Sequence, residues 1–391
     1  MFNKYKNKMR PKTWVEISSS ALKSNLEVFK RLVGPKVGLM AVIKANAYGH
    51  GAVEVARMAE RIGIAWFGVD AVQDGLALRE NGIQGSVLVM GYTPPENLRT
   101  AIESDLSFVA YGQEQAQELA KLSRGGFLKT KRAKVHLKIE TGTMRQGLFG
   151  KELVVFAKKL SAIKGVEIQG AYTHFANIED TTEHTFAASQ MRRFDEECAR
   201  LAAVGINVKV RHSACSAAAI LFPQTHHNLV RLGISMYGLW PSKETKAVAQ
   251  RSRRNNLNLK PVLAWKTTVA QVKTAAKGTG IGYGLAGHAT RVTKIAILPV
   301  GYWDGYDRKL SNVAHVLIRG ARCEVLGRIC MNMCMVDVTD VKGAKPGDVA
   351  VLLGADRREN ISAEELAGQI GTINYEVVTR INPLLPRIVV R

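Results

Sequence analysis

Cysteine is scarce in this chain, and its distribution argues against two common roles. The 391 residues include five cysteines, an odd number, and none of them shows the spacing of a zinc site. Disulfide frameworks need paired cysteines in an oxidising compartment. We therefore expect no bound metal and five free thiols in a reducing cytoplasm, at Cys198, Cys215, Cys323, Cys330 and Cys334.

Long hydrophobic runs are also missing. No stretch reaches the roughly 18 apolar residues that a membrane-spanning helix needs. The N-terminal residues 1–10 are basic, but no continuous apolar segment follows them, as it would in a secretory signal. We therefore expect a cytoplasmic protein with no membrane partner.

Acidic residues are few compared with basic ones, at 33 against 55, which gives a net charge of +22. Such an excess can indicate a nucleic-acid-binding protein. Here the basic residues are spread along the chain, with small clusters at 129–132 and 251–254, and no recognition motif accompanies them. An enzyme for anionic small molecules, or a solvated basic surface, explains the charge equally well, so we expect no nucleic-acid partner.

The first two-thirds of the chain alternates short apolar strands with amphipathic helices. One helix is expected between Ser20 and Gly34, and others at 52–61, 71–81, 96–103, 113–123, 152–162 and 186–204. Eight strands separated by helices predict an α/β fold with a (β/α)8 barrel, and an open doubly wound sheet is the alternative. The predicted strands are 38–43, 65–69, 86–89, 107–110, 135–139, 168–172, 208–211 and 228–230.

The pattern changes after about Pro241. Residues 242–260 are polar and basic and are typical of an interdomain connection. Beyond them, β-branched runs predict strands at 265–272, 292–299, 314–318, 323–327, 334–338 and 349–353, with one helix at 362–369 behind a capping Ser362. We expect a barrel domain at 1–250 and a mostly β domain at 251–391, with the first residues of the chain able to pack on the β domain.

Lys44 is the first candidate for chemistry. It ends an apolar strand and precedes the small-residue run Ala45–Asn46–Ala47–Tyr48–Gly49. Desolvation at such a position lowers the pKa of a lysine and makes its amine a nucleophile and a base. A lysine that only extends its ammonium to solvent is the alternative. The small neighbours, together with Tyr48 and His50, favour a functional site.

Further polar residues follow other predicted strands. Active sites of such barrels lie at the carboxyl ends of the strands. Singly, His174 is typical of a satisfied core histidine and Arg231 of a rim ion pair, but their convergence predicts one site. The polar residues after the strands are Lys44, Lys138, Glu140, Arg145, His174, His212, Ser213, Ser216 and Arg231.

A glycine-containing turn at 228–238 follows the last predicted strand. Barrels commonly bind phosphate in the loops after strands seven and eight, through backbone N–H groups. Ser216, which precedes three alanines, could add a hydroxyl from a helix N-terminus. A reactive lysine near a phosphate-binding turn suggests covalently bound pyridoxal 5′-phosphate (PLP).

With these residues in place, the chain resembles the alanine racemase family over nearly its whole length. The resemblance implies a PLP-binding barrel followed by a β domain, and racemisation of L- and D-alanine that supplies D-alanine for peptidoglycan. The matching stretches are 42–51, 135–147, 173–176, 216–218, 230–238, 282–284, 300–305, 327–331 and 373–377.

The resemblance also implies residue roles. Lys44 would carry PLP and act as one catalytic base, and Tyr283 would be the second base on the opposite face, because racemisation removes a proton on one side and returns one on the other. His174 and Arg231 would supply positive charge, and Arg231 would bind the pyridine nitrogen. The residues that match the phosphate site are Tyr48, Ser216, Gly233, Ile234 and Tyr375.

Other implied roles concern the substrate and the assembly. Arg145 matches an arginine near the PLP phenolic oxygen and the substrate carboxylate, and Met331 matches a backbone N–H donor to that carboxylate. Lys138 matches a lysine that is often carbamylated. In the family, Tyr283 and the Met331 segment reach the partner's barrel, which implies a homodimer with shared active sites.

Two positions depart from the family pattern. Asn332 replaces a common aspartate, and Cys215 replaces a common asparagine. Both bear on substrate preference, whereas Tyr375 favours a small side chain. A racemase for serine, lysine or arginine is the closest alternative. A related PLP decarboxylase, a non-catalytic PLP-binding barrel and a nucleic-acid-binding protein are more distant ones.

Overall fold

The computed structural model describes residues 10–180, 182–251 and 257–391. The predicted basic N-terminus and most of the 251–254 cluster lie outside the described residues. The chain forms two compact units. Counting the described residues alone, the barrel unit lies within Ala21–Ala47 and Val55–Lys260, and the β unit comprises residues 10–20, Tyr48–Glu54 and Pro261–Arg391.

The barrel unit contains eight parallel strands in the order β8-β7-β6-β5-β4-β3-β2-β9. The sheet nearly closes, because the Arg231 N–H on β9 donates to the Ala214 carbonyl just after β8, at 3.0 Å. This confirms the barrel and excludes the open sheet. The strands are β2 (Gly38–Val42), β3 (Trp66–Val69), β4 (Ser86–Val89), β5 (Leu106–Ala110), β6 (Ala133–Lys138), β7 (Val166–Tyr172), β8 (Val210–His212) and β9 (Leu229–Leu232).

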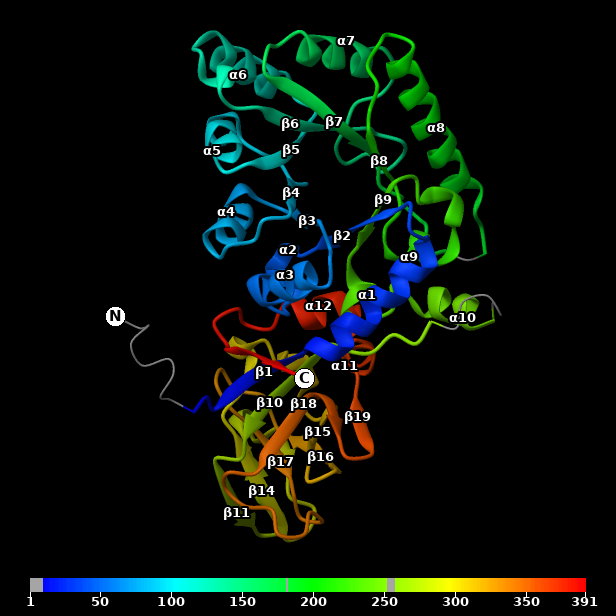
Figure 1. Cartoon of the computed structure of the whole chain (residues 1–391). Coiled ribbons are helices and arrows are strands. Elements are labelled where there is room, and N and C mark those ends of the chain that lie inside the picture. Colours follow the sequence, from blue (N-terminus) through cyan, green and yellow to red (C-terminus); the bar gives the residue numbers. More distant parts are fainter. Residues whose placement is uncertain (1–9, 181, 252–256) are drawn as a thin grey trace. The chain divides into compact units, whose positions relative to one another are not determined.

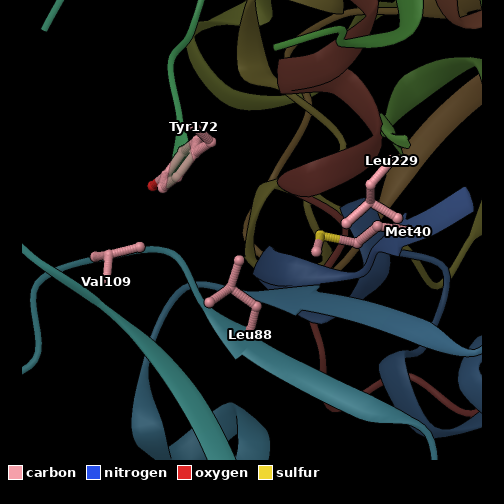
Figure 2. Packing of buried hydrophobic residues seen from close by; sticks show 5 residues of the cluster. All are labelled: Met40, Leu88, Val109, Tyr172 and Leu229. Atoms are coloured by element: carbon pink, nitrogen blue, oxygen red, sulfur yellow. The ribbon is translucent and has the colours of Figure 1, made fainter. Parts of the chain in front are cut away.

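Apolar side chains make up much of the inside of this barrel. Strand β5 is buried along its whole length, as expected for a parallel strand covered on both faces. Met40, Leu88, Val109, Tyr172 and Leu229 form one buried cluster, and Figure 2 shows their side chains facing a common interior. The barrel is therefore a packed core, and ligands have to bind at an end of it.

The helices of the barrel unit lie along the outside of the strands (Figure 1). The helical periodicity of the sequence predicted most of them to within two residues. They are α1 (Ser19–Val33), α3 (Ala52–Arg61), α4 (Val72–Glu80), α5 (Leu98–Glu103), α6 (Gln113–Arg124), α7 (Gly150–Ser161), α8 (Thr185–Ala202), α9 (Ser216–Leu221) and α10 (Lys243–Arg251).

Helix α10 corrects the expectation that residues 242–260 are only a connection. The Ser242 hydroxyl accepts the Thr245 N–H at 3.0 Å and caps the helix, and Thr245 and Ala249 are buried. The sequence of α10 is mostly polar because only one face of this helix is buried.

The β unit is built on a sheet in the order β11-β14-β17-β16-β15-β18-β10-β1-β20, with β19 paired to β18 and a separate pair β12–β13. Strand β1 (Thr13–Ser18) joins this sheet between β10 and β20. The others are β10 (Leu263–Thr268), β11 (Gln271–Ala275), β12 (Gly280–Ile281), β13 (Gly287–His288), β14 (Thr293–Leu298), β15 (His315–Ile318), β16 (Ala321–Leu326), β17 (Cys334–Asp337), β18 (Val349–Asp356), β19 (Glu359–Ile361) and β20 (Arg387–Val390).

The single strand predicted at 265–272 is wrong. It is two strands, β10 and β11, with a break at Val269 and Ala270, whose N–H groups donate to the carbonyls of Asp348 and Ile297, each at 2.8 Å. Neither residue is Gly or Pro, so the sequence does not signal the corner. The predicted helix is confirmed as α11 (Ala363–Ile370), because the Ser362 hydroxyl accepts the Glu365 N–H at 3.1 Å.

Within the described ranges, no helix has the length and apolar character needed to cross a membrane.

Candidate active site

Lys44 lies just past the carboxyl end of β2, at the start of an unusual turn. The next four residues, Ala45 to Tyr48, have φ angles of 51°, 53°, 54° and 53°, which is left-handed helical geometry without a single glycine. This conformation costs a non-glycine residue about 1–2 kcal/mol. The Ala47 N–H donates to the Ile43 carbonyl at 2.8 Å and helps to hold the turn. Strain of this kind is typical of functional sites.

Arg231 lies inside β9, rather than after the strand as its predicted end at Val230 implied. Its Nη1 donates to the His212 carbonyl at 2.7 Å and to His212 Nδ1 at 3.1 Å. Its Nη2 donates to the carbonyls of Thr173 and Ser213 at 2.8 and 2.9 Å, and faces His174 Nδ1 at 3.3 Å. In the part of the chain that the structure describes, its Nε–H has no acceptor. Arg231 therefore has one donor available to a ligand.

His174 follows β7 and is surrounded by positive charge. Burial lowers its pKa well below the ordinary value, and the charges of Arg231 and Lys138 lower it further, with smaller contributions from Arg145 and Lys44. The imidazole is therefore neutral at physiological pH. The same interactions place the charges of Lys44, Lys138, Arg145 and Arg231 in the neighbourhood of His174, at the carboxyl end of this barrel.

Lys138, the last residue of β6, is buried in an unusual way for a lysine. Its Nζ lies 4.3 Å from the centre of the Tyr172 ring and has no hydrogen-bond partner within the described ranges. Burial lowers its pKa to about 7, with further lowering by Arg231 and Arg145. A large fraction of this amine is consequently uncharged at neutral pH.

The turn after β9 lies near the start of α9. The Ser216 hydroxyl accepts the N–H groups of Gly233 and Ser235, at 3.1 and 3.4 Å. Ile234 begins the short helix η5 (Ile234–Tyr237), so its N–H has no carbonyl partner inside that helix. The Tyr237 hydroxyl donates to the Val42 carbonyl at 2.9 Å, which ties this turn to the end of β2 beside Lys44.

Glu140, which the strand-end pattern placed in the site, instead shapes the loop that carries Arg145. Its carboxylate accepts N–H groups of Gly142, Thr143 and Arg145 and the Thr143 hydroxyl. Arg145 itself is exposed.

Gln190 on α8 is a positioning residue that the sequence pattern did not reveal. It is fully buried, and its amide contacts the His174 carbonyl, the Ala176 N–H and the Thr141 hydroxyl at 3.0–3.2 Å. A glutamine inside a buried helix face was the only available signal.

In the β unit, Tyr283 begins the short helix η6 (Tyr283–Leu285) between Gly282 and Gly284, which have φ angles of 74° and 65°. Its side chain is 71% exposed and that of Leu285 is 61% exposed. Two left-handed glycines thus place an aromatic hydroxyl on the surface of this unit.

Met331 lies in an exposed loop that is held by its backbone. The Trp303 N–H donates to the Met331 carbonyl and the Tyr302 N–H to the Cys330 carbonyl, each at 3.0 Å. A Cβ on Gly301 would overlap the Cys330 and Met331 carbonyls, so this approach requires glycine. The Met331 side chain is 56% exposed.

Tyr48 and Tyr375 belong to the same unit. Their rings lie 6.0 Å apart at 52°, with Tyr375 on α12 (Asn374–Thr379). A Cβ on Gly49 would overlap the Val378 carbonyl of the same helix. The end of the left-handed turn therefore packs on α12.

A parallel barrel with a lysine, an arginine and buried histidines at its carboxyl end, followed by a β domain that presents a tyrosine, defines a class of barrel-plus-β-domain enzymes. Residues 17–241 match the model of the alanine racemase N-terminal domain, and residues 262–389 that of its C-terminal domain. The chain belongs to the alanine racemase family and is an isomerase, as the resemblance implied. The family is PLP-dependent.

The relatives agree over nearly the full length. An alanine racemase of Carboxydothermus hydrogenoformans is 42% identical, over 98% of this chain and 100% of the relative. The crystal structure of alanine racemase from Bacillus anthracis with bound L-Ala-P has a TM-score of 0.90 and 35% identity, over 98% and 96% of the two chains. A histidine racemase from Leuconostoc mesenteroides has a TM-score of 0.88 and 27% identity, over 98% and 99%.

Proposed function

We propose that the protein interconverts L- and D-alanine with PLP, using Lys44 and Tyr283 as its two bases. The observation that carries this proposal is the environment of Arg231. A fully buried cation has its Nη donors occupied and one donor left at the barrel end where Lys44 lies. Among the described residues, no acceptor uses that donor.

The residues present fit PLP. When bound, PLP covalently attaches to an amine and withdraws electrons from the substrate α-carbon, which makes its proton removable. Lys44 supplies the amine. The Arg231 Nε–H suits an unprotonated pyridine nitrogen, because arginine donates only and does not give up its proton. The N–H of Ile234, the Ser216 hydroxyl, Gly233, Tyr48 and Tyr375 are the groups we assign to the phosphate.

Lys44 and Tyr283 would hold and move the proton from opposite sides of the substrate α-carbon. An amine and a phenolate can each take this proton and return it. Nearby positive charge favours the phenolate. Because His174 is neutral, we assign this charge to Arg231.

The substrate carboxylate would be bound by the Arg145 guanidinium and the Met331 N–H. Arg145 is exposed within the loop between β6 and α7, and the Met331 N–H has no acceptor within the described residues. A guanidinium and a backbone N–H are both suited to a carboxylate.

We further propose a homodimer in which each β unit completes the active site of the partner subunit. The exposure of Tyr283, Leu285 and Met331 supports this, because large apolar and aromatic side chains on a surface mark interaction sites. Burial of these side chains against a second copy would then be part of catalysis.

Lys138 is proposed to be carbamylated. Its neutral amine would attack carbon dioxide, forming an N–C bond as one C–O π bond opens, and release one proton, which turns a neutral amine without a partner into an anion near Arg145 and Arg231. The orphan Nζ and the pKa of about 7 support this. Protein given ¹³C-bicarbonate should show a carbamate carbon signal that Lys138→Ala lacks. A signal that persists in this variant would contradict the assignment.

The activity has a direct test. The purified protein should absorb as lysine-bound PLP and should wash deuterium into the α-position of both alanine isomers. Lys44→Ala should lose the absorbance and the exchange. Tyr283→Ala should keep the absorbance and lose exchange mainly from L-alanine. A Tyr283→Ala enzyme of full rate would disprove the two-base assignment.

A broader amino-acid specificity is the second candidate. The histidine racemase neighbour shows that this fold accepts another side chain, and Asn332 departs from the family at an exposed position beside Met331. Turnover measured on alanine, serine, lysine, arginine and histidine decides between the two. We place the enzyme in the cytoplasm, where D-alanine would serve peptidoglycan synthesis.

A further inference from the structure

A chain of polar groups, all buried except the half-buried Gln169, leads from Arg231 into the interior of the barrel. His212 Nε2 lies 2.9 Å from His136 Nδ1, and His136 Nε2 lies 3.2 Å from Gln169 Oε1. The Ser107 hydroxyl donates to the same Gln169 oxygen at 3.0 Å. Both histidines are fully buried. These groups come from four neighbouring strands, β5 to β8.

The direction of every hydrogen bond in this chain follows from Arg231. A guanidinium can only donate, so His212 Nδ1 must be an acceptor and carry no proton. A neutral His212 then carries its proton on Nε2 and donates it to His136 Nδ1. His136 in turn donates its Nε2–H to the Gln169 oxygen. Each imidazole has one tautomer that satisfies both of its neighbours.

Both histidines are held in the neutral form. Burial lowers the pKa of His136 to about 4, with Gln169 opposing and Arg231 adding to the effect. Burial and then the charge of Arg231 hold the pKa of His212 well below its ordinary value. If His212 were doubly protonated, its Nδ1–H would face the Arg231 donor. If His136 were, its Nδ1–H would face the His212 Nε2–H.

The backbone of β6 and β7 leaves room for these side chains. The pairing of β6 with β7 shifts between Val135, opposite Ile168, and His136, opposite Gly170, so that Gln169 is an extra residue. Such a bulge redirects a side chain. A Cβ on Gly170 would lie 2.5 Å from His136 Nδ1, so only glycine leaves room for this ring. Tyr172 stacks on His212 at 4.8 Å and 8°.

We propose that His136 and Gln169 are positioning residues that hold His212 in the tautomer with a bare Nδ1, and thereby hold Arg231 in place for the pyridine nitrogen. This inference rests on the proposed PLP site. Without His136, the His212 Nε2–H is buried and unpaired, so the tautomer with the proton on Nδ1 no longer forfeits that hydrogen bond and its population rises. That tautomer points an N–H at the guanidinium and removes one of its acceptors.

The test uses the full-length protein with ¹⁵N-labelled histidine and two readouts. Nitrogen chemical shifts report the tautomer of His212, and dilution of the holoenzyme reports how tightly PLP is held. In His136→Leu, we expect the His212 proton to move to Nδ1 and PLP affinity to fall about tenfold, as for a buried donor left without its partner. His136→Asn, whose Oδ1 replaces the Nδ1 acceptor, should restore the tautomer and most of the affinity.

His226→Leu is the matched control. His226 is also buried, but it contacts the Ala219 carbonyl at 3.0 Å and lies outside the chain. It should change neither readout. If His136→Leu does not fold, Gln169→Met decides by the same readouts, because Gln169 is only half-buried.

An unchanged His212 tautomer in the folded variant would overturn the inference. A changed tautomer with unchanged PLP affinity would also overturn it, since positioning of Arg231 would then not depend on the chain. If the wild-type protein holds no PLP at all, the proposed function fails, whereas the tautomer comparison still stands.

Discussion

At the scale of single residues, Arg231 is a buried charge with no carboxylate partner among the residues that the structure describes. Burying an unpaired ion costs several kcal/mol unless other groups compensate. Three carbonyl oxygens and two imidazole nitrogens surround its Nη atoms. These are dipoles, so the positive charge is stabilised without being neutralised. A ligand at Nε therefore meets a full cation.

The neutral histidines behind Arg231 have a consequence for stability. The pKa of His136 is about 4 in the folded protein, against an ordinary value of 6.5. Between these values the unfolded chain binds a proton that the folded protein does not. Stability should therefore fall as the pH drops from 6.5 towards 4, by up to about 1.4 kcal/mol per pH unit for this one group.

Urea unfolding of the wild type and of His136→Asn at several pH values measures this effect. Asparagine does not titrate, and the other acid-sensitive groups are common to both proteins. The difference between the two stabilities should thus shrink as the pH falls below 6.5. Parallel curves would show that folding does not lower the pKa of His136.

The sequence could predict the polar residues at the strand ends, but not the residues that hold those side chains in position. Lys44 and His174 follow apolar strands, and the barrel rule then places them in one site. His136 is also on a strand, but its partner Gln169 faces it only because of a bulge. Alternation along a strand does not reveal such a bulge. The loop contacts of Glu140 were likewise not predictable, and for Gln190 a glutamine on a buried helix face was the only signal.

At the scale of elements, regular periodicity was predicted well and irregular backbone was not. The barrel strands and helices follow from apolar spacing, because each buries a defined face. The left-handed turn after Lys44 could not be foreseen, since Ala, Asn, Ala and Tyr carry no glycine signal. Tertiary packing selects this conformation. The Gly49 backbone, packed on α12, is one visible cause.

A β-branched residue in the left-handed turn at 45–48 should lower the free energy of unfolding more than the same residue in an ordinary helix. Ala45 is exposed and left-handed, so Ala45→Val adds crowding near the backbone without filling a core. We expect a loss of about 2 kcal/mol, from the left-handed strain of a branched side chain. The measurement is urea unfolding, followed by absorbance of bound PLP.

Ala188→Val is the control for that substitution. Ala188 is exposed on the ordinary helix α8, where the change should cost only about 0.6 kcal/mol of helix propensity. Equal losses at the two positions would mean that the turn stores no special strain.

At the scale of the whole molecule, the proposed bases belong to different units of the chain: Lys44 to the barrel unit and Tyr283 to the β unit. An exposed tyrosine between two left-handed glycines has no role for its own unit's core. Its place in a shared homodimeric site would explain its exposure. The strand and helix pattern of the sequence predicted the barrel domain and the β domain. The association of two subunits leaves no such pattern in the sequence of one chain.

Co-expression of two inactive variants with different tags tests this sharing. In a mixed dimer of Lys44→Ala and Tyr283→Ala, one site receives both substitutions and the other receives neither, provided that Tyr283 serves the partner's barrel. The purified mixed dimer should then have about half the activity of the wild-type dimer, because two-fold symmetry gives two equal sites. Pairing Lys44→Ala with the double variant should give none, since no Lys44 remains. An inactive mixed dimer would mean that each subunit builds its site from its own Lys44 and Tyr283.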